Sequence, residues 1–206
     1  MKKFLLAVLV ALAFSTAAFS QIRDKGTEWG FNIGYNGSTT NAPESEFLSS
    51  NGIRVGFDAG ITADNYFSDR WSLKIGINYY QKGWNNGIIA SSNHLNFTDY
   101  HLNYITVPVL ANWHFGHSRK WYLHFGPYAG VLLNAKETYD GTDVKSFFNT
   151  LDAGLDVGIG FKFPISHQTK FFIEFNEQDG ITSIAKGDDM PNIRNQSSGL
   201  SIGLNF

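Results

Sequence analysis

The sequence predicts an all-β fold, an eight-stranded antiparallel up-and-down transmembrane β-barrel of the outer-membrane type. Three observations predict this fold class. Eight segments alternate apolar residues with polar residues or glycine, the connections between them alternate in length, and the chain opens with the pattern of an export signal. Successive side chains of an extended strand point to opposite faces, so each alternating segment predicts a strand with one apolar and one polar face.

Residues 1–20 are predicted to be a signal peptide, and residues 21–206 the barrel domain. Two lysines precede an apolar run from Phe4 to Phe14, and small residues lead to the expected cleavage after Ser20. This run is too short for a membrane-spanning helix, and no later segment of the sequence reaches the ~20 apolar residues that such a helix needs. Integration into a membrane is therefore expected to come from strands.

The first three strands are expected at residues 29–35, 53–62 and 71–80. Their apolar faces are formed by Trp29, Phe31, Ile33 and Tyr35, then Ile53, Val55, Phe57, Ala59 and Ile61, then Trp71, Leu73, Ile75, Ile77 and Tyr79. The residues between them are mostly small or polar. These second faces include the charged side chains of Arg54, Asp58 and Lys74.

The fourth and fifth strands, at residues 104–113 and 121–131, each contain a proline. Their apolar faces are Ile105, Val107, Val109, Ala111 and Trp113, then Trp121, Leu123, Phe125, Pro127, Ala129 and Val131. Proline removes one donor from the strand ladder, so a bulge or a local weakening is expected at Pro108 and at Pro127. His124 belongs to the polar face of the fifth strand.

The last three strands, at residues 151–163, 171–176 and 199–206, alternate most clearly. Their apolar faces are Leu151, Ala153, Leu155, Val157, Ile159, Phe161 and Phe163, then Phe171, Ile173 and Phe175, then Leu200, Ile202, Leu204 and Phe206. The opposite faces carry Asp152, Asp156, Lys162 and Glu174. Phe206 ends an alternating strand, so it is expected to be the assembly signal that barrel-assembly machinery recognises.

The connections between the strands differ in length. Those at 64–70, 114–120 and 164–169 are short, whereas those at 37–52, 83–100, 132–150 and 179–196 are long and rich in Asn, Ser, Asp and Gly. An outer-membrane barrel with an even number of strands has short periplasmic turns and longer external loops. Both termini are therefore expected on the periplasmic side.

The apolar faces are expected to meet lipid in the bacterial outer membrane. A soluble barrel would turn its apolar face inward around a ligand. Here the polar faces combine charges with glycine, which suits a tight lumen. Trp71, Trp113 and Trp121 lie at strand ends beside the short connections, where aromatic rings favour a membrane interface.

The charged residues of the polar faces are the candidate functional residues: Arg54, Asp58, Lys74, His124, Asp152, Asp156, Lys162 and Glu174. An eight-stranded barrel has a lumen just wide enough for side chains to fill, and buried charges need partners. The favoured interpretation is an ion-pair network that plugs the barrel. The alternative is a narrow path for ions.

The composition excludes several classes of function. The chain has no cysteine, which excludes disulfides and thiolate metal sites. Without Lys2 and Lys3, 14 basic residues stand against 18 acidic ones, with no basic block, which argues against nucleic acid as a partner. No G-x-S-x-G motif is present, and Asp99 with His101 is the remaining candidate for a catalytic pair at the rim. We expect no catalytic residue, no metal and no cofactor.

Three segments carry a resemblance to a known family. They read NYITVPVLANWHFG at 103–116, KWYLHFGPYAGVLL at 120–133 and LDAGLDVGIGFKF at 151–163, with further similarity over 55–83. In these segments the chain resembles the PorT-like, or porin-family, outer-membrane β-barrel proteins of Bacteroidota. The resemblance implies an outer-membrane barrel and, through one branch of the family, a link to protein secretion.

The expected function is therefore that of a non-enzymatic structural or interaction barrel, linked to protein secretion if the PorT-like resemblance extends that far. A narrow porin-like channel for ions or small solutes is the alternative, and a membrane enzyme with a rim site is the third. The expected partners are outer-membrane lipid, the barrel-assembly machinery during biogenesis, and a protein that contacts the four long loops. A monomer is expected.

Overall fold

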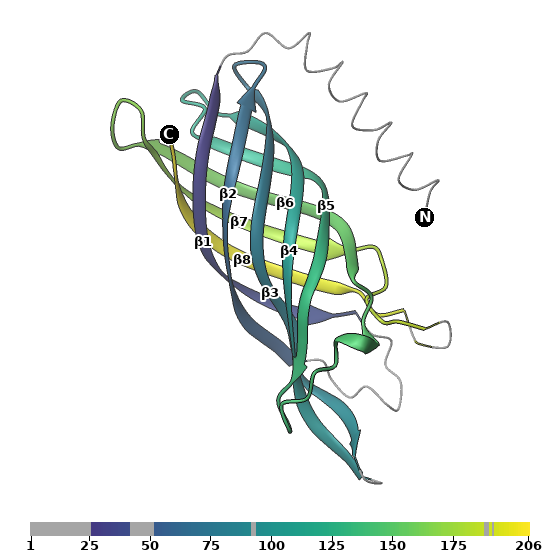
Figure 1. Ribbon diagram of the computed structural model, residues 1–206. Coiled ribbons are helices and arrows are strands. Elements are labelled where there is room, and N and C mark those ends of the chain that lie inside the picture. The colour runs from purple at the N-terminus through teal and green to yellow at the C-terminus, as the bar shows by residue number, and fades with distance from the viewer. Residues whose placement is uncertain (1–25, 42–51, 92–93, 188–189, 191) are drawn as a thin grey trace.

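The computed structural model describes residues 26–41, 52–91, 94–187, 190 and 192–206. Within these residues, eight antiparallel strands form a closed barrel in which β1 also pairs with β8 (Figure 1). The strands are β1 (Thr27–Thr40), β2 (Gly52–Tyr66), β3 (Trp71–Ser91), β4 (His94–Phe115), β5 (Trp121–Glu137), β6 (Leu151–Pro164), β7 (Lys170–Gly180) and β8 (Asn195–Asn205). The predicted fold class is confirmed, whereas the predicted signal peptide lies outside the described residues.

One short 3-10 helix, η1 (Lys145–Phe147), follows β5. No helix in the described part of the chain is long and apolar enough to cross a membrane.

The two ends of the barrel differ. The start of β1, the end of β8 and the short β2–β3, β4–β5 and β6–β7 turns lie at one end, which we call the turn end (Figure 1). The β3–β4 hairpin and the connections after β5 and β7 lie at the other, which we call the loop end. Backbone hydrogen bonds in both directions between Trp29 and Phe206 join the first and last strands at the turn end.

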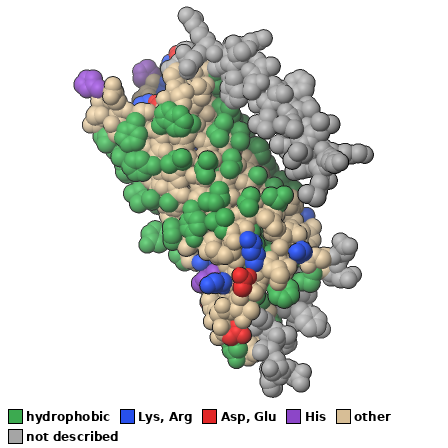
Figure 2. Space-filling view, viewed as in Figure 1, with side chains coloured by type: hydrophobic (Ala, Val, Ile, Leu, Met, Phe, Trp, Pro, Cys, Tyr) green, Lys and Arg blue, Asp and Glu red, His purple; other side chains and the backbone are tan. Residues whose placement is uncertain are grey.

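The predicted alternation of faces is confirmed in all eight strands. Each side chain expected to point outward is exposed or half-buried. Each charged side chain expected to point inward is buried. Figure 2 shows the result as an apolar band around the visible wall, with charged side chains beyond its ends.

The apolar band has the height of a bilayer core. On β3 its outward residues run from Trp71 to Tyr79, nine residues, and a tilted strand needs about 9–11 to cross a membrane. Beyond it the outward side chains become polar. For example, Asn103 Nδ2 donates to Asn134 Oδ1 at 2.8 Å on the exposed face of β4 and β5.

Aromatic rings form a girdle at the turn end. Consecutive ring centroids lie 4.9 to 6.4 Å apart along Trp71, Trp113, Phe115, Trp121, Phe161, Phe163 and Phe171. The three tryptophans expected at a membrane interface belong to this girdle. Such rings favour the boundary between hydrocarbon and water.

The predicted loop at 83–100 is wrong, because this segment is a strand hairpin. β3 and β4 remain paired up to Ser91 and His94. The Asn- and Gly-rich composition suggested a loop, but the register shifts between Trp84 and Gly87 and the ladder then continues. Asn86 adopts a φ of 59° within this bulge, a conformation that asparagine tolerates better than most residues.

The two prolines weaken pairing without causing bulges. The β3–β4 pairing lapses beside Pro108, and the β4–β5 pairing lapses beside Pro127. The register is the same on both sides of each gap. A missing N–H donor removes a hydrogen bond from the ladder without adding a residue, so no shift follows.

The closed lumen as the candidate functional site

The structure places all eight candidate residues in the lumen, where each is buried. Their side chains lie at three levels along the barrel. We describe these levels from the turn end to the loop end, followed by an apolar layer above them.

At the first level, Lys162 bridges two carboxylates. Its Nζ lies 2.7 Å from Asp64 Oδ2 and 3.4 Å from Glu28 Oε2. Lys170 pairs with the other oxygen of Glu28. Sequence reasoning missed both acids, because the predicted first strand began after Glu28 and the second ended before Asp64. Continuing the alternation by one step at each strand end would have found them.

At the second level, Glu174 is surrounded by donors. Lys74 Nζ lies 2.6 Å from its Oε2, and the hydroxyl of Tyr122 donates to the same oxygen at 2.6 Å. His124 lies between two carboxylates, with Nδ1 3.4 Å from Glu174 Oε2 and Nε2 3.3 Å from Asp156 Oδ1. Four of the candidate residues therefore form one connected group.

At the third level, Lys82 and Asp152 form a fully buried ion pair. Lys82 Nζ lies 3.0 Å from Asp152 Oδ2 and 4.4 Å from the centre of the Tyr128 ring. Asn195 Nδ2 donates to the same carboxylate oxygen at 3.0 Å. Lys82 was missed because the third strand was expected to end at Tyr80. It lies one step further along the same inward face.

Arg54 and Asp58 have no ion-pair partner among the described residues. Arg54 Nη1 donates to the backbone carbonyl of Lys82 at 2.8 Å. Asp58 Oδ2 accepts hydrogen bonds from Asn32 Nδ2 and Ser201 Oγ, each at 3.2 Å. The structure thus brings six of the eight candidates into ion pairs and places these two apart from them.

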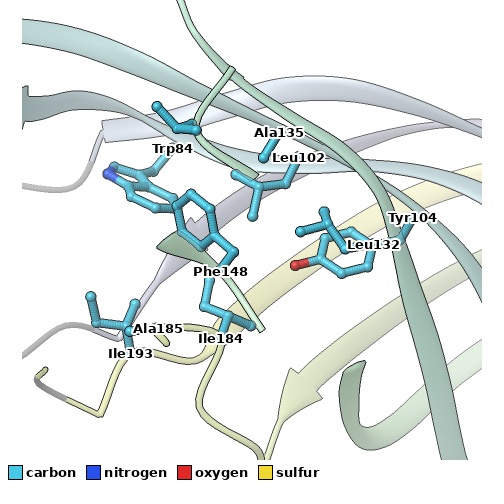
Figure 3. Packing of buried hydrophobic residues seen from close by; sticks show 10 residues of the cluster. Trp84, Leu102, Tyr104, Leu132, Ala135, Phe148, Ile184, Ala185 and Ile193 are labelled. Carbon is cyan, nitrogen blue, oxygen red and sulfur yellow. The ribbon is translucent and has the colours of Figure 1, made fainter. Parts of the chain in front are cut away.

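An apolar cluster, which we call the apolar plug, lies at the loop end of the lumen. It consists of Trp84, Leu102, Tyr104, Leu132, Ala135, Val144, Phe148, Ile184, Ala185 and Ile193. Figure 3 shows these side chains converging from the strands and from the connections that follow β5 and β7. One signal in the sequence could have indicated the plug, since the inward faces of β4 and β5 become apolar at Leu102 and Leu132.

Backbone and amide hydrogen bonds hold the two connections over the lumen. Phe148 and Ala185 form an isolated β-bridge. Asn149 Nδ2 donates to the carbonyls of Ser183 and Ala185 at 2.9 and 2.7 Å. The plug is therefore fastened to both connections and not only to the barrel wall.

Glu137, at the loop end beyond the apolar band, organises the connection after β5. Its carboxylate accepts hydrogen bonds from Thr98 Oγ1 and from the backbone N–H groups of Tyr139, Asp140 and Thr142, at 2.7 to 3.2 Å. Burial opposes ionisation, but hydrogen bonds with the side chains of Asp140 and Thr98 and with the backbone of Thr142 and Tyr139 outweigh it and lower the pKa of Glu137 to about 2.

The described residues contain no group of three or more His, Asp or Glu side chains that could hold a metal ion. Asp99, the acid of the candidate rim pair, accepts the backbone N–H of Asn86 on its Oδ1 at 3.0 Å. It therefore helps to fix the hairpin bulge. His114 points into the lumen, with Nε2 3.2 Å from Ser72 Oγ.

Residues 19–186 match the model of the family described as outer membrane protein beta-barrel domain. Among curated proteins, no relative matches the chain.

Solved structures of outer-membrane proteins share the fold. Neisserial surface protein A is 19% identical, with a TM-score of 0.51, over 88% of this chain and 98% of that one. OprG from Pseudomonas aeruginosa is 10% identical, with a TM-score of 0.53, over 88% and 97%. Ail, the attachment invasion locus protein of Yersinia pestis, is 16% identical with a TM-score of 0.43, over 87% and 98%. At these identities the likeness concerns the fold alone.

Proposed function

The chain belongs to the outer membrane protein beta-barrel domain family, and from this membership we propose that it is a non-conducting, non-enzymatic barrel that presents a protein-binding surface outside the cell. The protein lies in the bacterial outer membrane. Short turns of such barrels face the periplasm and longer loops face outward, so the loop end is the external one.

The observation that carries this proposal is the apolar plug. A pore for ions or solutes needs a continuous path of water through the barrel. Here Phe148 and its neighbours are buried together at the loop end, and the fully buried Lys82–Asp152 pair lies next to them, which supports a blocked path. Connections that contact only water would not need to bury five apolar residues against the barrel, so the arrangement favours an external surface that the plug holds in a fixed shape.

The external surface exposes large apolar side chains outside the apolar band. Phe97, Tyr139, Phe147, Ile181 and Met190 are each at least half exposed. Aromatic residues and methionine are enriched at protein interfaces, where they act as anchors. We therefore place the protein-binding surface on the β3–β4 hairpin and on the connections after β5 and β7.

The narrower link to PorT-like proteins and to protein secretion stays a prediction. The family model describes the barrel domain and specifies no partner. The proposal requires only that a protein partner contacts the external surface.

Conductance tests the non-conducting part of the proposal. The chain is refolded in detergent and inserted into a planar bilayer, with the Asp156→Ala, Glu174→Ala double variant beside it. We expect no current steps from the unmodified chain. Reproducible steps from it would replace the proposal with the channel alternative, because they would require a water path past the apolar plug.

Site-specific photo-crosslinking in living cells tests the external surface. A photoreactive phenylalanine analogue replaces Phe147, which is exposed at the loop end, or Phe125, which is equally aromatic but lies in the apolar band. We expect a discrete protein adduct at position 147 and none at position 125. No adduct at 147, 97 or 139 would contradict a protein partner at this surface.

A further inference from the structure

We propose that a central cavity in the lumen binds one small alkali-metal cation, with the Asp58 carboxylate as its main ligand. The cavity has a volume of about 30 Å³ and lies beside the second level of charges. This proposal is independent of the protein-binding surface, since it concerns the interior of the barrel.

The charges around the cavity do not balance. Lys74 and Glu174 pair with each other, and Asp156 has His124 as its partner. Asp58 also lines the cavity, is 3% exposed, and has no cation within ion-pair distance among the described residues. A buried carboxylate without a positive partner is strongly destabilising, so a mobile cation would supply the missing charge.

The unpartnered atoms around the cavity are mostly oxygens that can only accept. Five such oxygens are buried without a hydrogen-bond partner: those of Asn32, Asp58, Asn78, Asn176 and Gln178. The donors there are the hydroxyl of Tyr80, the ring of His124 and the ammonium group of Lys74, and the last two already face carboxylates. Water needs donors as well as acceptors around it, whereas a cation needs oxygens alone.

Two of the amide groups have an orientation that the neighbouring carboxylates set. Asn32 Nδ2 donates to Asp58 Oδ2 at 3.2 Å, and Gln178 Nε2 donates to Asp156 Oδ2 at 2.8 Å. Because each nitrogen is turned toward a carboxylate, each carbonyl oxygen is left for another partner. The second oxygen of Asp58 is likewise without a donor.

The ligand type and the size of the cavity select the class of cation. Carboxylate and amide oxygens suit hard cations, not the softer metals that histidine and cysteine bind. The volume of about 30 Å³ accommodates about two water-sized particles, such as one dehydrated cation and one water. Because one carboxylate lacks an ion-pair partner, a cation with a single positive charge would balance it. Sodium is the simplest such cation with which to test binding.

Glycine makes this arrangement possible at the wall. A Cβ atom on Gly34 would lie 2.6 Å from Asp58 Oδ1, and one on Gly60 would lie less than 2 Å from Asn78 Oδ1. The side chains of Asp58 and Asn78 therefore occupy space that a residue larger than glycine at position 34 or 60 would fill. The absence of a Cβ at these positions lets the two oxygens lie close against the barrel wall.

Urea unfolding of the detergent-folded chain tests the proposal. Sodium chloride replaces choline chloride stepwise at constant total chloride, because choline is too large for the cavity. We expect the unfolding equilibrium constant to fall about tenfold for each tenfold rise in sodium above the dissociation constant, as one bound cation requires. Equal stability in the two salts at every ratio would overturn the proposal.

Three variants identify the ligand. Asp58→Asn should lose the dependence on sodium, and Asp179→Asn, the same change at an exposed position, should keep it. Asn32→Lys, which places an ammonium group beside Asp58, should fold stably and be independent of sodium. If Asp58→Asn does not fold, the sodium dependence of the unmodified chain and of Asn32→Lys still tests whether Asp58 is the ligand. Sodium dependence that survives in Asn32→Lys would contradict the assignment to Asp58.

Discussion

At the scale of single residues, the lumen contains charged side chains that are buried away from water. Lys82 is the clearest case, because its side chain is fully buried against Asp152 and the rings of Tyr80, Tyr104 and Tyr128. A pair of this kind contributes little compared with an apolar pair of the same shape, but removing one partner leaves the other uncompensated.

Lys82→Met should therefore lower the free energy of unfolding by about 3–5 kcal/mol. Adding Asp152→Asn to it should restore part of that loss, because the uncompensated carboxylate is then gone. The measurement is urea unfolding of the detergent-folded chain. Arg119→Ala, which breaks the exposed pair with Asp69, is the control and should cost less than about 1 kcal/mol. Equal losses of unfolding free energy for Lys82→Met and Arg119→Ala would contradict a buried pair of Lys82 and Asp152.

Glu137 predicts a pH dependence for the connection after β5. Its pKa is about 2 in the folded chain, against 4.5 for an ordinary glutamate. A lowered folded pKa means that the stabilising contribution is complete above pH 4.5 and is lost as the pH falls toward 2. The protection of the amides of Tyr139 and Thr142, measured relative to the intrinsic exchange rate at each pH, should therefore fall over this interval. In Glu137→Gln the same amides should exchange faster at neutral pH and lose this dependence.

At the scale of elements, adjacent strands approach each other where glycine occupies the inward face. A Cβ atom on Gly154 of β6 would lie 2.0 Å from the carbonyl oxygen of Asp179 on β7. On the neighbouring strand, a Cβ on Gly130 would meet nothing closer than a methyl group of Thr106 at 3.3 Å. Similar glycines in the alternating pattern therefore have different structural roles.

Gly154→Ala should destabilise the barrel by about 1–3 kcal/mol, because a backbone atom of β7 must move. Gly130→Ala should change stability by less, since a side-chain methyl can yield. Urea unfolding of both variants measures the difference. If Gly130→Ala proves the more damaging, the close approach of β6 and β7 is not what makes glycine necessary.

At the scale of the whole molecule, the lumen holds two different kinds of packing, one after the other along the barrel. Ion pairs and hydrogen bonds lie in the lumen within the apolar band, and the apolar plug lies at the loop end, where we propose that it seals the mouth. The plug depends on side chains from two separate connections, so it should open as a unit when one large member is removed.

Thiol labelling tests this closure, because the chain has no cysteine of its own. Leu132→Cys places one thiol within the plug. We expect it to react with a water-soluble maleimide slowly, and at least tenfold faster when Phe148→Ser is added. Phe147→Ser, at the exposed neighbouring position, should leave the rate unchanged. Fast labelling of Leu132→Cys alone would show that water already reaches the plug.

The sequence by itself determined the fold class. It also determined which side chains of each strand point into the lumen and which face the membrane. These properties follow from a period of two, which is local and needs no knowledge of distant residues. It also placed all eight candidate charges in the lumen, and it missed Glu28, Asp64 and Lys82 only where an expected strand began too late or ended too early.

Only the tertiary structure decided which charges meet, where the lumen closes and which carboxylate lacks a partner. Lys74 and Glu174 are 100 residues apart and Lys82 and Asp152 are 70 apart, so no local pattern links them. The hairpin at 83–100 and the plug depend on the register of closure and on connections that fold back over the barrel. Such contacts depend on how all eight strands are arranged in the closed sheet. The residue pattern of one strand carries no information about that arrangement.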